Sequence, residues 1–307
     1  MPYLPDGKSV GVVTLTNSVS LWDAQTMMPK ENLTAMGMRN LWPEVSPDGR
    51  FLAVGGLDGY LRVWDFTERR VVTSQPAWPE PDQVDHSADW VWLSNFSRDG
   101  SRLLTGNMTF PVRLIVEWEV PAWKPLARWG IELAGGGALS PDGKLFACGR
   151  YDGKVIIWDI ENGRSRAEMV HQGEVCALAF SPDGRLLATG SNYGTVVLWD
   201  TQDWQALTPP LPGHRLAIYC IAFSHDGTRL ATSGGSREEA VLLWDVATRR
   251  QIATLRAEGT TFRGVTFSPD DSTILVQSVE RDLYIWRAPS WDKIKAVEAP
   301  ERERAKE

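Results

Sequence analysis

One short segment recurs seven times along this 307-residue chain, and it limits the fold more than any other feature. A well-formed copy reads FSPDGRLLATGSNYGTVVLWD, from Phe180 to Asp200. In five copies the Trp follows the Ser position of S-P-D-G by 18 residues, and in the other two by 20 and 21. The repeated residues are Trp22, Trp64, Trp118, Trp158, Trp199, Trp244 and Trp286. Such constant spacing indicates one structural unit stacked many times.

Each copy has the pattern of short antiparallel strands. The runs R-L-L-A-T-G and T-V-V-L-W-D are rich in β-forming residues, and the glycines between them supply hairpin turns. In five of six cases, 22 to 25 residues separate a Trp from the next Ser position. That length holds an outer strand such as Q-I-A-T-L and an inner strand such as V-C-A-L-A-F. Four strands in a repeat of roughly 40 residues predict the blade of a propeller.

The repeat resembles the WD-repeat (WD40) family, whose units end in Trp-Asp and fold as β-propellers. The resemblance extends over nearly the whole chain. It implies an all-β, seven-bladed β-propeller of four-stranded antiparallel blades over residues 1–299, followed by a charged, disordered tail at 300–307. A Trp at the end of every third strand predicts a packing residue between blades. Trp123, Trp204 and Trp291 each lie five residues after a blade Trp, which predicts packing as well.

Members of that family often tie each blade with a His, a Ser or Thr, the Trp, and an Asp in the central hairpin turn. In this chain the set is broken in every blade. His171 and His214 occupy the His position, but their hairpin turns lack the Asp, whereas Asp58 and Asp152 lie in blades without that His. We therefore expect apolar packing between blades to hold the ring, without this tie.

The two ends of the repeat array are irregular. Met1 aligns with Leu178, so the first blade is expected to be incomplete at its N-terminal inner strand. The run from Ser290 to Ala299 is expected to form the outer strand of the last blade. Either the ring closes by face packing alone, or this chain is the end of a longer one. We favour the second interpretation, because the ending resembles bacterial multidomain proteins in which a propeller follows a signalling domain.

Residues for catalysis are sparse. The four histidines are dispersed, and no nucleophile, phosphate-binding or metal-binding motif occurs. The isolated Cys148, Cys176 and Cys220 lie in apolar strand patterns and are expected to be buried hydrophobes. The glycine-rich run at 134–138 predicts close backbone approach at the central channel. We predict no catalytic residues, no cofactor and no metal.

The charge distribution limits the partners. The chain has 32 Lys and Arg residues against 39 Asp and Glu residues, a net charge of −7 without a basic block. This composition disfavours nucleic acid and anionic membranes as partners. The chain begins without a signal pattern, and no apolar run approaches the roughly 20 residues of a membrane helix. We expect a cytoplasmic protein.

Two insertions over the third blade mark a candidate contact surface. The connection at 74–90 is about nine residues longer than its counterparts, and the hairpin at 106–114 is also lengthened. Loops on a rigid scaffold often carry function. The candidate partner-binding residues are Trp78, Asp82, Asp85, His86, Asp89, Trp90 and Phe110. Their aromatic and acidic character suits a basic protein or peptide, whereas the alternative is a loop that packs on its own blade.

Hairpin turns on the same face supply three further candidates, Arg150, Tyr193 and Arg237, for which solvated turns are the alternative. The leading functional hypothesis is a non-catalytic protein-interaction scaffold or recognition module. The competing hypothesis is a propeller enzyme or small-ligand sensor with a site in the central channel. The fold by itself does not choose between them.

Overall fold

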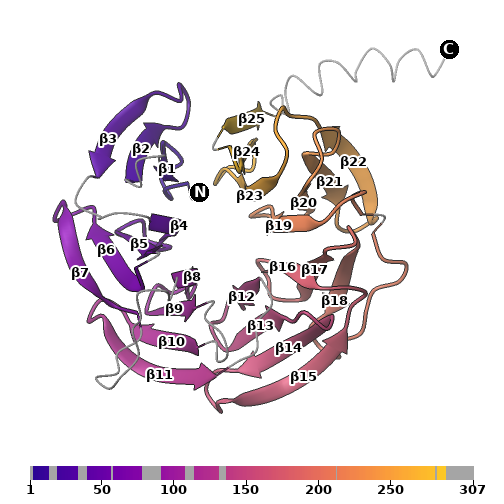
Figure 1. Ribbon diagram of the computed structural model, residues 1–307, viewed down its shortest axis with the longest axis horizontal. Coiled ribbons are helices and arrows are strands. Elements are labelled where there is room, and N and C mark those ends of the chain that lie inside the picture. Colours follow the sequence, from indigo (N-terminus) through magenta and orange to yellow (C-terminus); the bar gives the residue numbers. More distant parts are fainter. Residues whose placement is uncertain are drawn as a thin grey trace.

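The computed structural model describes residues 3–13, 19–33, 40–56, 58–77, 91–107, 114–130, 136–211, 213–280 and 282–287. Their regular structure consists of strands, which form seven antiparallel sheets around a common axis (Figure 1). No helix occurs within these ranges. The expected all-β, seven-bladed propeller is therefore confirmed.

Each sheet is one blade, and we number the blades in chain order. Blade 1 contains β1 (Ser9–Val13), β2 (Val19–Asp23) and β3 (Pro29–Leu33). Blade 2 contains β4 (Asn40–Val45), β5 (Phe51–Gly56), β6 (Tyr60–Asp65) and β7 (Arg70–Pro76). Blade 3 contains β8 (Val91–Phe96), β9 (Arg102–Asn107), β10 (Leu114–Glu119) and β11 (Lys124–Gly130). Blade 4 contains β12 (Gly137–Leu139), β13 (Leu145–Gly149), β14 (Lys154–Asp159) and β15 (Arg164–Val170). Blade 5 contains β16 (Val175–Phe180), β17 (Leu186–Ser191) and β18 (Val196–Asp200). Blade 6 contains β19 (Ile218–Phe223), β20 (Arg229–Gly234), β21 (Val241–Asp245) and β22 (Arg250–Leu255). Blade 7 contains β23 (Phe262–Phe267), β24 (Thr273–Ser278) and β25 (Leu283–Arg287).

The S-P-D-G segments form tight turns that are held by their own side chains. In blade 5 the Ser181 hydroxyl donates to Asp183 Oδ1 at 2.6 Å and accepts the backbone N–H of Leu186 at 2.9 Å. Gly184 completes the turn with φ of 72°, a conformation that other residues adopt at a cost. This local bonding explains why the four residues recur together.

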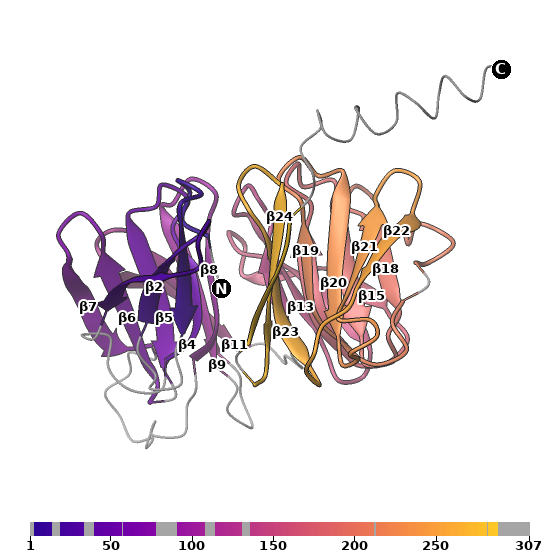
Figure 2. The same cartoon turned by 90° about the horizontal axis from the view of Figure 1, so that it is seen from above.

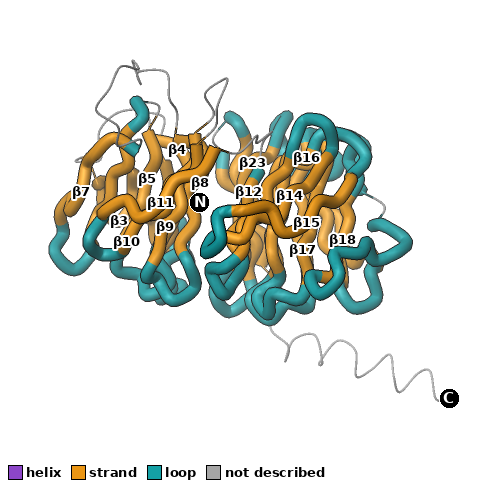
Figure 3. Tube along the Cα trace, turned by 90° about the horizontal axis from the view of Figure 1, so that it is seen from below, coloured by secondary structure: helices purple, strands orange, loops and turns teal. Residues whose placement is uncertain are grey.

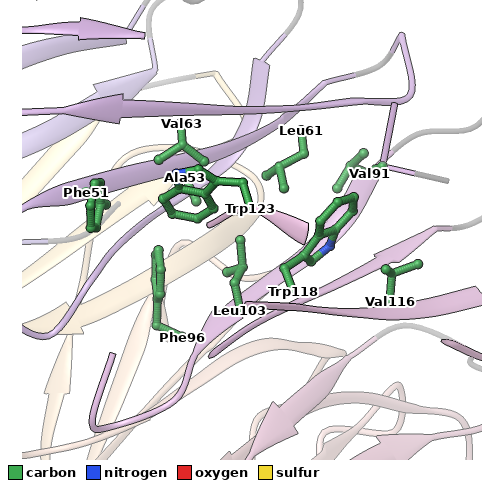
Figure 4. Close-up of a cluster of buried hydrophobic side chains, with 11 residues drawn as sticks. Phe51, Ala53, Leu61, Val63, Val91, Phe96, Leu103, Val116, Trp118 and Trp123 are labelled. Carbon is green, nitrogen blue, oxygen red and sulfur yellow. The ribbon is translucent and has the colours of Figure 1, made fainter. Parts of the chain in front are cut away.

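The repeated Trp packs against the preceding blade. Trp118 of blade 3 is fully buried near Leu61 of blade 2 and Val91 of its own inner strand, and Val63 of blade 2 belongs to the same cluster (Figure 4). Trp123 joins this cluster, with its ring edge-on to Phe51 at a centroid distance of 5.1 Å. The packing role that we predicted for these residues is confirmed, and Trp204 likewise packs against the cluster around Trp199. Trp291 lies outside the described residues.

Three of these indoles are also hydrogen-bonded. The Nε1–H groups of Trp118, Trp199 and Trp244 donate to the hydroxyls of Thr105, Thr189 and Thr232 at 2.8, 2.8 and 3.1 Å. The equivalent position is Cys148 in blade 4 and Val12 in blade 1, and the buried Nε1 atoms of Trp158 and Trp22 have no hydrogen-bond partner.

The four-member set is broken in blade 6, as predicted, but part of the tie still forms. There His214 Nε2 lies 2.9 Å from the Thr232 hydroxyl, which also accepts from Trp244, so three of the four members are joined. Glu239 in the hairpin turn accepts the backbone N–H of Arg215 at 2.9 Å. In blade 5 the tie is absent, because His171 Nε2 has no partner.

Three blades depart from four strands among the described residues. Blade 1 has only a single bridge, between Tyr3 and Val10, where an inner strand would lie, as predicted. In blade 5 the outer strand is reduced to isolated bridges at Ala206 and Leu211. Pro209 and Pro210 explain this loss, because proline has no N–H for the ladder. The outer strand expected at 290–299 and the tail at 300–307 lie outside the described residues.

Candidate interaction surface

The strands run from one face of the ring to the other, so the turns gather at two rims (Figures 2 and 3). We call one rim the hairpin-turn face. It carries the turns between the second and third strands of each blade and the connections to the next blade. The opposite rim, the S-P-D-G face, carries the S-P-D-G turns.

Exposed apolar side chains concentrate on the hairpin-turn face. Seven of the ten large, exposed hydrophobic residues among the described part of the chain lie there. They are Tyr60, Tyr151, Val170, Tyr193, Leu216, Tyr219 and Val279. Tyrosine supplies a large contact area with a polar tip, which is typical of protein–protein interfaces.

Tyr193 is the most exposed of these tyrosines, at 72%. It lies in the hairpin turn of blade 5, before Gly194, whose φ of 77° is needed for the turn. A Cβ built on Gly173 would lie 2.7 Å from Tyr193 Cδ2, so the ring rests directly on the Gly173 backbone. The adjoining connection therefore supports the tyrosine from one side, while most of its surface faces solvent.

A second group lies over blades 6 and 7. Leu216 and Tyr219 both contact Gly235, since a Cβ built there would be 3.7 Å from Leu216 Cβ and 3.5 Å from Tyr219 Cε2. The guanidinium of Arg263, on the inner strand of blade 7, lies 5.7 Å from the Tyr219 ring centroid. This stacking is a cation–π contact that holds the ring beside the channel.

Charged residues on this face largely pair with each other. Arg215 contacts Glu239 at 3.4 Å, and Arg256 contacts Glu238 at 3.5 Å, beside a cavity of about 370 Å³. Arg150 contacts Asp152 at 3.3 Å. These exposed pairs contribute little to stability, each about 0–1 kcal/mol. They leave the face mixed in charge, with Tyr and Leu side chains between the pairs.

The sequence-based candidates fall into two groups. Arg150, Tyr193 and Arg237 lie on the hairpin-turn face over blades 4, 5 and 6, and Tyr193 and Arg237 are exposed. The other candidates lie outside the described residues; these are Trp78, Asp82, Asp85, His86, Asp89, Trp90 and Phe110.

Sequence reasoning missed Leu216 and Tyr219 as surface residues. Leu216 had a readable signal, because it is an apolar residue in a connection between strands. Tyr219 had none, since it lies in an apolar inner strand and its exposure follows from its place at the channel.

On the opposite, S-P-D-G face, the turns of neighbouring blades contact each other around the ring. Each turn glycine lies beside the turn of the preceding blade; for example, a Cβ built on Gly184 would lie 3.6 Å from Pro141 Cδ. At the joint of blades 6 and 7 both members differ. His225 replaces the proline, and Asp271 replaces the glycine at φ of 56°.

Three hydrogen bonds join this exchanged pair. Asp271 Oδ1 accepts from the backbone N and from Nδ1 of His225, both at 2.8 Å, and Oδ2 accepts the backbone N–H of Asp226 at 3.0 Å. Proline could not donate the first of these bonds. The hydrogen bonds between His225 and Asp271 therefore replace the proline–glycine contact found at other joints.

Groups with chemical reactivity are isolated within the described ranges. No three His, Cys, Asp or Glu residues come together there to hold a metal ion. The three cysteines are free thiols, and burial raises the pKa of Cys148 to about 12 and that of Cys176 to about 11. Burial lowers the pKa of His171 and of His214. Across the described residues, no helix has the length and apolar character that a membrane span requires.

The profile of the family described as "WD domain, G-beta repeat" matches four segments, residues 39–65, 136–159, 164–200 and 206–245. Protein HIR1 from Yarrowia lipolytica is 28% identical over 244 residues, which is 79% of this chain and 18% of that protein. Protein tipD from Dictyostelium discoideum is 39% identical over 74 residues, 24% of this chain and 12% of that protein. Elongator complex protein 2 from Mus musculus is 35% identical over 80 residues, 25% of this chain and 10% of that protein. The chain spans less than a quarter of the length of the curated relatives that it matches.

Proposed function

Because this chain is a WD40-repeat β-propeller, we propose that it is a non-catalytic scaffold that binds a partner protein through the hairpin-turn face of blades 4 to 6. The observation that carries the proposal is the group of exposed side chains Tyr151, Tyr193, Leu216 and Tyr219 on one face of a rigid ring. Aromatic residues of this kind dominate the binding energy of many interfaces. One relative carries a complex in its name, Elongator complex protein 2, which agrees with a role in an assembly.

The chemistry of the face supports binding over catalysis. Among the described residues, its Arg and Glu side chains pair with each other, as Arg215 does with Glu239 and Arg256 with Glu238. The exposed tyrosines are held by backbone contacts and by the stacked Arg263, so little conformational entropy is lost when they are covered. The predicted insertion residues over blade 3 would extend the same face toward a basic partner.

The experiment compares wild-type protein with Tyr193→Ala and Tyr219→Ala in affinity capture followed by mass spectrometry. Each substitution should weaken capture of the same partner by about 2 kcal/mol, roughly thirtyfold, without a change in melting temperature. Met28→Ala is the matched control, because Met28 is an exposed apolar residue on the opposite face. A partner whose capture depends on Met28 but on neither tyrosine would contradict this surface.

Three further expectations belong to this proposal. A cytoplasmic location is part of the proposal and is tested by cell fractionation. The net charge of −7 opposes binding to nucleic acid or anionic vesicles, and salt-dependent retention on immobilised DNA would contradict it. Membership of a larger bacterial signalling protein remains a prediction, to be tested on the gene; the relatives named above are eukaryotic.

A further inference from the structure

The central channel ends on the S-P-D-G face in a cavity of about 520 Å³. Blades 7, 1 and 2 form its walls, and His225 of blade 6 completes the lining. Blade 1 contributes Tyr3 and Pro5 to the lining. Blades 2 and 7 contribute the ends of their inner strands, β4 and β23. The volume is in the range of small-ligand sites, about 300–1,000 Å³.

Much of this wall is apolar and lacks hydrogen-bond donors. The prolines that line it have no N–H to offer; they are Pro5, Pro43, Pro47 and Pro269. Tyr3 adds an aromatic ring, whereas the Phe267 side chain is only 2% exposed and packs in the core between blades 6 and 7. Such a surface packs well against an aliphatic chain, as the stems of long charged side chains do elsewhere in proteins.

Glu44 places one carboxyl group in this lining. No Lys or Arg side chain among the described residues pairs with it. Burial raises the pKa of Glu44 to about 7, although the chain's α-amino group acts in the opposite direction. A carboxylate in such surroundings is costly unless a cation approaches it.

His225 adds a second acceptor. Its Nδ1 lies 2.8 Å from the Asp271 carboxylate, which can only accept, so the proton of the neutral ring is on Nδ1. The remaining nitrogen, Nε2, is then an acceptor. His225 Nε2 and the Glu44 carboxylate are therefore both hydrogen-bond acceptors, and a ligand with N–H groups and a positive charge complements them.

We propose that this cavity binds the side chain of a lysine or arginine from a partner protein. The methylene stem lies against the prolines and the Tyr3 ring, and the cationic head lies at Glu44. Because the cavity is on the face opposite Tyr193, this inference does not depend on the hairpin-turn surface, and either can fail alone.

The test uses the full chain and three probes, the N-acetyl methylamides of lysine, arginine and norleucine, titrated by saturation-transfer NMR. The cationic probes should bind at least tenfold more tightly than norleucine. Glu44→Gln should reduce their affinity at least tenfold. Glu161→Gln, an exposed carboxyl at an outer turn of blade 4 on the same face, is the matched control and should leave it unchanged.

The pH dependence identifies the responsible group. With a pKa of about 7, ionisation of Glu44 should strengthen lysine binding roughly tenfold from pH 6 to pH 8. His225 is the other ionisable side chain near Glu44 in the lining besides Tyr3, whose pKa burial raises above its ordinary value. The increase should persist in His225→Gln and vanish in Glu44→Gln. Equal binding of lysine and norleucine by the wild type, or unaltered lysine binding by Glu44→Gln, would overturn the proposal.

Discussion

Replacing Cys148 by Thr should strengthen the joint between blades 3 and 4. Cys148 in blade 4 is equivalent in position to Thr189 in blade 5. The Thr189 hydroxyl accepts a hydrogen bond from Trp199 Nε1–H at 2.8 Å. Trp158 therefore keeps a buried Nε1–H without an acceptor. A buried, unsatisfied donor costs about 1–3 kcal/mol, and a typical hydrogen bond contributes a net 0.5–1.5 kcal/mol.

The new hydroxyl also needs an acceptor for its own proton. In blade 5 the Thr189 hydroxyl donates to Val197 O at 3.4 Å, and Ile156 is the equivalent residue in blade 4. Thr is close to Cys in volume, so overpacking should be small. We expect a net gain of about 1 kcal/mol in the free energy of unfolding, or about 2–4 °C in melting temperature.

Urea unfolding, followed by circular dichroism, measures the gain against a matched control. Cys148→Val has nearly the shape of Thr without the hydroxyl, so the difference between the two variants isolates the hydrogen bond. Cys148→Thr should exceed Cys148→Val by about 1–2 kcal/mol. Equal stability of the two variants, or a less stable Thr variant, would show that the Trp158 indole has no need of this acceptor.

Three further outcomes follow from the packing. Trp199→Ala should lower the free energy of unfolding by about 3–5 kcal/mol through lost contacts and a cavity, and an unchanged melting temperature would refute its packing role. His225→Pro and Asp271→Gly should each lower the free energy of unfolding by about 1–2 kcal/mol. The double variant has the proline and glycine found at other joints, so it should lose less than the sum of the two single losses. Strict additivity in a double-mutant cycle would show that the two exchanges are independent. Because burial lowers the pKa of His171 and of His214, the unfolded chain binds protons first, so stability should fall as pH drops below about 6.5. Replacing both with Gln should flatten that slope in thermal melts, and an identical slope would contradict the buried neutral state.

The sequence predicted the ring, the number of blades and the packing of Trp118. Each depends on the spacing between the S-P-D-G segment and the Trp, which recurs seven times in the chain. The incomplete outer strand of blade 5 could also have been found, since Pro209 and Pro210 interrupt it. The exposure of Tyr219 could not, because an inner-strand residue becomes a surface residue only when the blades are arranged around a channel.

The partial tie at His214 was missed for a different reason. We treated the four members as one set, whereas the Thr232 hydroxyl can join His214 and Trp244 with no Asp at all. The pairing of His225 with Asp271 likewise needs two turn residues that are 46 positions apart in sequence to be brought side by side.

Two joints of the ring keep a buried indole N–H without a partner. Trp22 lies at the joint of blades 7 and 1, and Trp158 lies at the joint of blades 3 and 4. At the joints between blades 4, 5 and 6, in contrast, the indoles of Trp199 and Trp244 donate hydrogen bonds to threonine hydroxyls. Tyr193 and Tyr219 lie on these hydrogen-bonded blades, so a partner there meets a preformed surface. The cavity at Glu44 instead spans the joint at which the Trp22 indole has no acceptor.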